Sequence, residues 1–80
     1  MTEDRLHTEL LSFWKRLLKT EDISIDDDFF EKGGDSLLAM DVNVELQRLT
    51  GKAMPESILF DAPTVRELAK RVVRHLSEGE

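Results

Sequence analysis

The sequence predicts an all-α fold: a small four-helix bundle of three longer helices and one short one, with a long loop between the first two. Apolar residues recur at helical spacing in three stretches of the chain. No stretch shows the alternation of apolar and polar residues, bounded by turn signals, that is typical of paired strands. The chain has 80 residues, and we expect residues 1–80 to form a single domain without a large internal cavity, since a chain this short buries only about three-fifths of its unfolded surface.

The first helix is expected over residues 4–19. Its apolar residues follow one another at spacings of four, three, one and three positions, which places them on one side of a helix. They are Leu6, Leu10, Phe13, Trp14 and Leu17, and Leu11 and Leu18 widen the stripe. Core packing is the expected role of this stripe.

The loop expected over residues 20–35 is long for so small a domain. Long loops are often functional, or they are anchored by apolar side chains of their own. Ile23, Ile25, Phe29 and Phe30 are available as anchors, and we expect at least one phenylalanine to pack inward. Residues 20–36 also carry seven acidic side chains against one lysine. This charge either belongs to a solvated loop or steers basic partner surfaces toward the end of the loop.

The second helix is expected over residues 36–50 and has two apolar faces. At about 100° per residue, one group of side chains forms a face toward the core, and a second group lies on the opposite side. The core group is Leu38, Val42, Leu46 and Leu49, and the opposite group is Leu37, Met40 and Val44. The second group either packs beneath neighbouring loops or forms an exposed patch for partner proteins. Gly51 is expected to end the helix.

The remaining two helices are a short one and the last one. Pro55 and Pro63 enclose a segment that is too short for an independent helix, since fewer than ~12 residues are marginal in water. We therefore expect at most a short packed helix over 56–61. The last helix is expected over 64–77, because Thr64 and Glu67 have the spacing of a capping box before a clean apolar stripe.

The most informative motif is Gly33-Gly34-Asp35-Ser36-Leu37, at the start of the second helix. Two glycines permit a sharp turn. A serine at the start of a helix lies beside unpaired backbone N–H groups and the positive end of the helix dipole, which suits a phosphate. The alternative is that Ser36, or Asp35 before it, is an ordinary N-cap.

Composition excludes several classes of function. A net charge of −6 argues against nucleic-acid binding. The longest apolar run has four residues, far fewer than the ~20 that cross a membrane, and the N-terminus lacks the pattern of a signal peptide. We therefore expect a cytoplasmic protein that binds no membrane. Without cysteine the chain has no thiol, so thiol chemistry would require an added group.

A metal site is not expected. Asp26, Asp28 and Glu31 have part of the spacing of a calcium loop. However, Phe30 stands where such a loop needs an oxygen ligand, and Glu31 stands where it needs a glycine. The acidic run therefore predicts weak, incidental cation binding at most.

Two motifs together resemble the acyl and peptidyl carrier domains of polyketide and nonribosomal peptide synthases. They are Asp27-Asp28-Phe29-Phe30 leading into Gly33-Gly34-Asp35-Ser36-Leu37-Leu38, and Phe60-Asp61-Ala62-Pro63-Thr64-Val65-Arg66-Glu67-Leu68-Ala69. The resemblance covers nearly the whole chain. It implies that Ser36 receives a 4′-phosphopantetheine arm from coenzyme A, attached by a dedicated, magnesium-dependent phosphopantetheinyl transferase. The thiol of the arm would carry acyl, aryl or aminoacyl intermediates as thioesters.

The resemblance also implies roles for neighbouring residues. The chain would be a monomeric carrier and not an enzyme, and loading and condensing enzymes of a synthase would act on its cargo. Leu37, Met40 and Val44 would form a docking face for these partners, with the segment around Ile58 contributing. Asp35 is unfavourable beside a phosphate and would instead serve the encounter with the transferase.

The sequence departs from the common peptidyl-carrier pattern at two positions. Lys32 stands where an apolar residue, usually leucine, precedes the glycines, which removes an anchor and predicts a looser loop. Asp35 stands where histidine is frequent in elongating peptidyl carriers. The aspartate is common in acyl and aryl carriers and in some peptidyl ones, so the class of cargo stays open.

Two other functions compete with this interpretation. Gly34-Asp35-Ser36-Leu37 matches the serine motif of one hydrolase family, in which Ser36 would need a histidine and an oxyanion hole. That motif follows a strand in a much larger α/β domain, and His7 and His75 lie in the terminal helices instead. The other competitor is an unmodified acidic interaction module that binds partners through the loop and the second apolar stripe.

Overall fold

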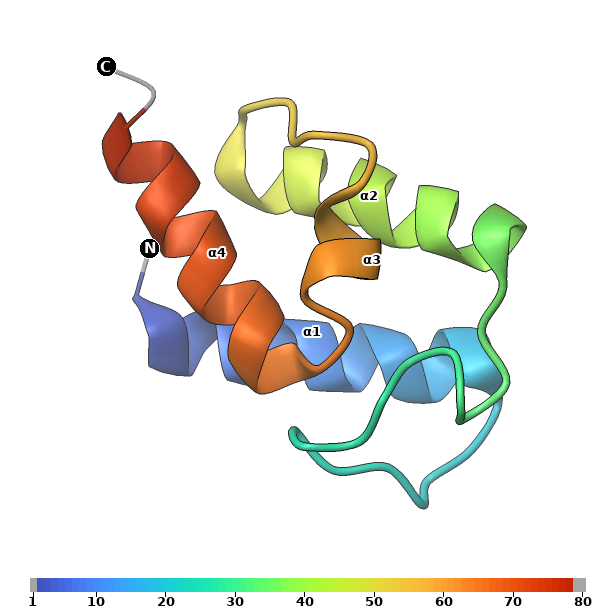
Figure 1. The fold of residues 1–80 in the computed structure, drawn as a ribbon. Coiled ribbons are helices and arrows are strands. Elements are labelled where there is room, and N and C mark those ends of the chain that lie inside the picture. The colour runs from blue at the N-terminus through green and yellow to red at the C-terminus, as the bar shows by residue number, and fades with distance from the viewer. Residues whose placement is uncertain (1, 79–80) are drawn as a thin grey trace.

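The computed structural model describes residues 2–78 and contains four α-helices, as the sequence predicts. They are α1 (Glu3–Leu18), α2 (Ser36–Thr50), α3 (Ile58–Asp61) and α4 (Val65–Glu78). The described residues form no strand. Figure 1 shows α1 and α2 as two long rods, α4 crossing beside α1, and the short α3 between α2 and α4. None of the four helices has the length and hydropathy that a membrane crossing requires.

The observed helix bounds lie close to the expected ones, with one exception. α2 has the expected bounds, whereas α1 begins and ends one residue earlier and α4 one residue later than expected. Differences of one residue lie within the variation between assignment criteria. α3 is shorter than the expected 56–61, because the chain first forms a turn in which the Ile58 N–H donates to the Pro55 carbonyl at 3.1 Å.

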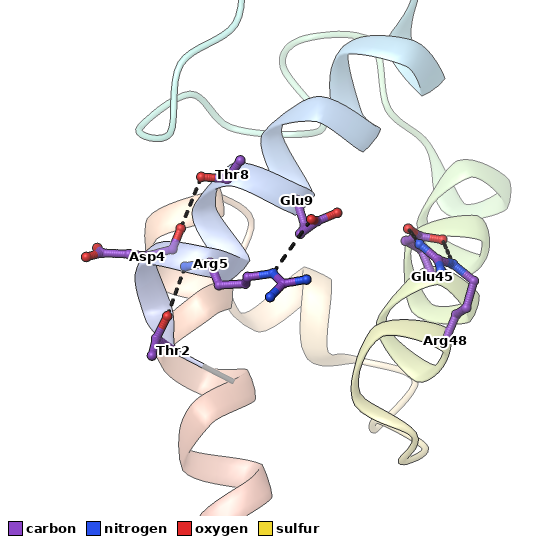
Figure 2. Close-up of polar contacts among 7 residues, drawn as sticks. All are labelled: Thr2, Asp4, Arg5, Thr8, Glu9, Glu45 and Arg48. Carbon is purple, nitrogen blue, oxygen red and sulfur yellow. Dashed lines mark hydrogen bonds and ion pairs between the residues drawn. The ribbon is translucent and has the colours of Figure 1, made fainter.

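Local capping explains where the longer helices begin and end. The Thr2 hydroxyl accepts a hydrogen bond from the Arg5 N–H at the start of α1 (Figure 2). Gly51 ends α2 in the left-handed conformation, with φ of 75°. Before α4, the Thr64 hydroxyl accepts from the Glu67 N–H at 3.1 Å and donates to the Glu67 carboxylate at 3.0 Å. The Thr64 hydroxyl therefore caps α4 as predicted, but the Glu67 carboxylate bonds to that hydroxyl and not to the Thr64 backbone N–H that a full capping box requires.

Ion pairs also lie along the exposed faces of the helices. Figure 2 shows Arg5 beside Glu9 on α1, at 3.8 Å, and Arg48 beside Glu45 on α2, at 2.6 Å. Arg48 donates to both oxygens of Glu45, and this hydrogen bonding holds the pKa of that carboxyl below its usual value. These pairs support single helices and do not join one helix to another.

One apolar core joins all four helices and the long loop. The residues with no exposed surface include Leu6, Leu10 and Trp14 of α1, Val42 and Leu46 of α2, Val65, Leu68, Ala69 and Val72 of α4, and Phe29 of the loop. Trp14 and Phe29 are the largest of these side chains, and their rings meet edge to face with centroids 4.8 Å apart. Phe29 is therefore the inward-packing phenylalanine that the sequence predicts.

The loop over residues 19–35 is fixed to the link between α3 and α4 and to the first turn of α4. The Phe29 N–H donates to the Pro63 carbonyl at 2.8 Å, and the Arg66 N–H donates to the Ile25 carbonyl at 3.0 Å. The Arg66 guanidinium also donates to both carboxylate oxygens of Asp26, at 2.7 and 3.2 Å. The loop and the start of α4 are about forty positions apart in the sequence. These long-range contacts therefore fix the position of the end of the loop, next to Ser36.

Candidate functional site

Ser36 is the first residue of α2, and its side chain is exposed. The N-cap is Asp35, whose carboxylate accepts a hydrogen bond from the Leu38 N–H at 2.9 Å. Within residues 2–78, the Ser36 hydroxyl makes no hydrogen bond. Because Asp35 supplies the cap, Ser36 is free for another role.

The two glycines are required for different reasons. Gly33 has φ of 110°, a conformation that only glycine adopts readily. Gly34 lies against Phe29: a Cβ at this position would be 2.3 Å from two carbons of the Phe29 ring and 2.8 Å from its carbonyl oxygen. The Gly34 N–H also donates to that carbonyl at 2.9 Å. This close packing attaches the residues before Ser36 directly to the core.

Most of the clustered aspartates in the loop have structural partners. The Asp27 carboxylate accepts from the Ser24 N–H at 2.8 Å, and the Asp28 carboxylate accepts from the Phe30 and Glu31 N–H groups at 2.8 and 3.2 Å. Hydrogen bonding from the Arg66 guanidinium lowers the pKa of Asp26. These carboxylates therefore hold the turns of the loop.

Lys32 does not act as an apolar anchor, but it does have partners. Its ammonium lies 3.8 Å from the Asp27 carboxylate, and its N–H donates to the Asp28 carbonyl at 3.1 Å. An ion pair and a turn hydrogen bond therefore take the place of the apolar contact. Greater mobility of the loop at Lys32, which the sequence predicts, stays a prediction.

The second apolar stripe of α2 is exposed. Leu37, Met40 and Val44 are 74%, 64% and 68% exposed, whereas Val42 and Leu46, on the opposite face, have no exposed surface. Of the two alternatives raised by the sequence, packing beneath neighbouring loops is therefore excluded. α2 presents an apolar patch that begins next to Ser36.

An open groove of about 480 Å³ lies beside this patch. Ser36 lines one end of it, Met40 and Val44 line the α2 side, and Met54 and Phe60 line the side formed by α3 and the segment before it. Asn43 donates a hydrogen bond across to the Pro55 carbonyl at 3.3 Å. The groove therefore connects the exposed hydroxyl with apolar surface from two helices.

The prediction that Ile58 belongs to this surface is wrong. Its side chain is only 4% exposed, because Ile58 packs into the core together with Leu59 and Ala62. Phe60, which sequence reasoning missed, is 53% exposed and lines the groove. Positions 58, 59 and 62 share one helical face, and Phe60 lies outside it. That pattern could have identified Phe60 if the start of α3 had been known.

The arrangement around Ser36 does not support hydrolysis by this chain. Neither histidine lines the groove: His7 lies on α1, and His75 lies on α4 with its Nε2 at 3.2 Å from the Ala53 carbonyl. Among the residues that the structure describes, no strand precedes Ser36, as the serine motif of a hydrolase would require. Across residues 2–78, no three His, Cys, Asp or Glu side chains are grouped so that they could hold a metal ion.

The family model, the related sequences and the solved structures that this chain resembles all indicate the same family. Residues 8–72 match the family model described as a phosphopantetheine attachment site. The chain is 42% identical over 64 residues to indigoidine synthase of Dickeya dadantii (strain 3937), an alignment that covers 80% of this chain and 4% of the synthase. The chain therefore corresponds to a small part of that relative.

Two solved structures agree in both fold and sequence. One is a chain of the complex of the phosphopantetheine transferase Sfp with coenzyme A and a peptidyl carrier protein. It has a TM-score of 0.79 and 35% identity, over 86% of this chain and 90% of that one. The other is a free-standing peptidyl carrier protein from Acinetobacter baumannii. It has a TM-score of 0.86 and 26% identity, over 94% and 96% of the two chains.

Proposed function

This chain belongs to the phosphopantetheine-attachment family, and we propose that Ser36 is the residue to which the group is attached. The family's cofactor is 4′-phosphopantetheine, and a carrier domain is a tethering module and not an enzyme. The single observation that carries the assignment to Ser36 is its exposed hydroxyl at the first position of α2, beside a groove and with the N-cap supplied by another residue.

The residues around Ser36 fit a phosphodiester. The first N–H groups of an α-helix lack partners in the helix and lie at the positive end of its dipole, which favours a negative group. In α2, the Leu38 N–H is taken by Asp35, while the N–H groups of Ser36 and Leu37 make no hydrogen bond within the described residues. When attached, the arm supplies a thiol that carries cargo as a thioester.

The residues around Ser36 indicate which groups a transferase would have to supply. No histidine lines the groove beside Ser36, and the carboxylate of Asp35, its neighbour in the sequence, is bonded to a backbone N–H. A transferase would therefore supply both the base and the magnesium ion. Leu37, Met40 and Val44, with Phe60 in place of Ile58, are the docking residues that we propose for this transferase and for synthase enzymes. Asp35 keeps its proposed role in the transferase encounter beside its role as N-cap.

We further propose that loading and condensing enzymes of a synthase act on the cargo. The matched synthases support this proposal, although the chain spans only 4% and 6% of two indigoidine synthases. Single-domain organisation over 1–80, the monomeric state and the cytoplasmic location stay predictions. The class of cargo, acyl, aryl or aminoacyl, stays open.

One experiment distinguishes the proposal from its rivals. The purified chain is incubated with coenzyme A, magnesium and a broad-specificity phosphopantetheinyl transferase, and its intact mass is measured. We expect wild type and Ser12→Ala to gain one phosphopantetheine group and Ser36→Ala to gain none; Ser12, an exposed serine of α1, is the matched control. A folded wild-type chain that gains no group would favour an unmodified interaction module. Ester hydrolysis by the unmodified chain would favour the hydrolase.

A further inference from the structure

Four aromatic rings form a continuous row from the core to the groove. Trp14 of α1 meets Phe29 of the loop with ring centroids 4.8 Å apart, and Phe29 meets Phe30 at 5.3 Å, both edge to face. Phe30 then stacks on Phe60 of α3 at 4.9 Å, with only 17° between the ring planes. The row therefore begins at a fully buried ring and ends at one that is half exposed.

The Phe30–Phe60 stack joins the two structures that meet at the groove. Phe60 belongs to the wall formed by α3. Phe30 belongs to the loop that ends at Ser36, and its carbonyl accepts a hydrogen bond from the Gly33 N–H at 3.4 Å. From Gly33, only Gly34 and Asp35 separate the loop from Ser36. The stack is thus a short connection between the groove wall and the serine.

The other contacts of α3 lie on its opposite side. Ile58 and Leu59 face the core, where α3 packs against α4. The hydrogen bond between Phe29 and Pro63 fixes the loop to the link that follows α3, and not to the groove wall itself. On the groove side, the stacked rings are the aromatic contact between α3 and the loop.

We propose that Phe30 and Phe60 form a positioning pair, which holds the α3 wall of the groove at a fixed place relative to Ser36. A transferase that binds the groove would then meet the Ser36 hydroxyl at a fixed position relative to its binding surface. This inference rests on the proposed attachment at Ser36, and it adds that the two phenylalanines act together. Phe60 is thus both a positioning residue and part of the groove surface. Phe30 does not line the groove, and it acts on the groove wall through its contact with Phe60.

A double-mutant cycle tests the pair. Phe30→Leu, Phe60→Leu and the double variant are compared with wild type as substrates of the transferase, and kcat and KM for the carrier are measured separately. We expect each single variant to raise KM about two- to tenfold, the range that one aromatic pair supports. The double variant should be no worse than the poorer single variant, because either substitution already removes the stack. Phe60→Tyr keeps a stacking ring, so its KM should equal that of wild type.

Two further measurements separate positioning from general loss of structure. Phe13→Leu, on α1, is the matched control: its ring is also partly buried and lies beneath Arg16, away from the groove, and its KM should not change. In Phe60→Leu, the amide signals of Gly33 and Gly34 should shift in the NMR spectrum, since the loop loses its contact with α3. Unshifted amide signals in a folded Phe60→Leu variant would overturn the pair even if Phe30→Leu fails to fold.

The possible failures are distinguishable. If wild type gains no phosphopantetheine, the proposed function falls and the pair falls with it. If wild type is modified but the effects of Phe30→Leu and Phe60→Leu multiply in the double variant, the two rings act independently. In that case only the pair is refuted, and Phe60 acts through its proposed docking contact with the transferase alone.

Discussion

Substituting Gly34 by alanine should destabilise the protein through one identifiable contact. The new Cβ would lie 2.3 Å from two ring carbons of Phe29 and 2.8 Å from its carbonyl oxygen. Phe29 is fully buried and packs against Trp14, so its ring cannot turn away into solvent. Either the ring or the backbone at Gly34 has to move, and overpacking of this kind typically costs about 1–3 kcal/mol.

This cost is large for a domain of this size. Small domains unfold with about 5–15 kcal/mol, and each kcal/mol lowers the melting temperature by roughly 4–8 °C. We therefore expect Gly34→Ala to lower the free energy of unfolding by about 1–3 kcal/mol in urea titrations followed by circular dichroism. The loop before Ser36 should shift as well, and transfer of phosphopantetheine should slow.

Two comparisons make the result decisive. Gly51→Ala places a Cβ in open space at φ of 75°, so it reports the backbone cost alone, about 1–2 kcal/mol. In Gly34→Ala combined with Phe29→Leu, the smaller side chain makes room, and the double variant should lose less stability than the sum of the singles. If Gly34→Ala unfolds within about 0.5 kcal/mol of wild type, or if the two losses simply add, the close contact does not hold the loop.

Three more predictions concern the cap, the acidic loop and the exposed face of α2. Asp35→Ala should lower the free energy of unfolding by about 0.5–2 kcal/mol, while Asp35→Ser, which keeps a capping oxygen, should stay near wild type; equal losses in both variants would show that the cap is not what matters. Because Arg66 lowers the pKa of Asp26 in the folded protein, the pair stabilises the fold above the carboxyl's unfolded value and loses this contribution as pH falls through the lower, folded value. We therefore expect the free energy of unfolding, measured by urea titration at a series of pH values, to fall less steeply toward acidic pH for Arg66→Gln than for wild type. The same dependence of unfolding free energy on pH in both proteins would count against the pair. Met40→Glu and Val44→Glu should weaken transfer by the transferase with melting nearly unchanged, whereas Val42→Glu, which buries a charge in the core, should unfold the protein; a collapse of the first two variants would show that the stripe is core.

The helices and the position of Ser36 could be predicted because their determinants are local. The stripes of α1 and α4 follow helical periodicity, and α2 shows its two faces in the same way. The Thr64–Glu67 cap also depends on residues within one turn. Each of these features is encoded in residues three or four positions apart, so tertiary context does not change it.

The features that sequence reasoning missed depend on contacts between distant segments. α3 has only four residues, too few to show a periodicity, so sequence reasoning placed the buried Ile58 on the docking surface and did not identify the exposed Phe60. The Asp26–Arg66 ion pair spans forty positions, and nothing in the acidic run indicates which carboxylate has a partner. The stack of Phe30 on Phe60 is nonlocal in the same way.

Residues other than Ser36 make the contacts that hold its surroundings in place. Asp35 caps the helix, Gly34 fits against a buried ring, and Phe30 contacts the groove wall. If the chemistry of attachment is supplied by a partner enzyme, the contribution of this chain is the placement of one hydroxyl. Placement of that kind is sensitive to substitutions that never touch the hydroxyl, because a small displacement of a reacting group costs a large factor in rate. Under the proposed attachment at Ser36, the loop and α3 therefore belong to the functional site as much as the serine does.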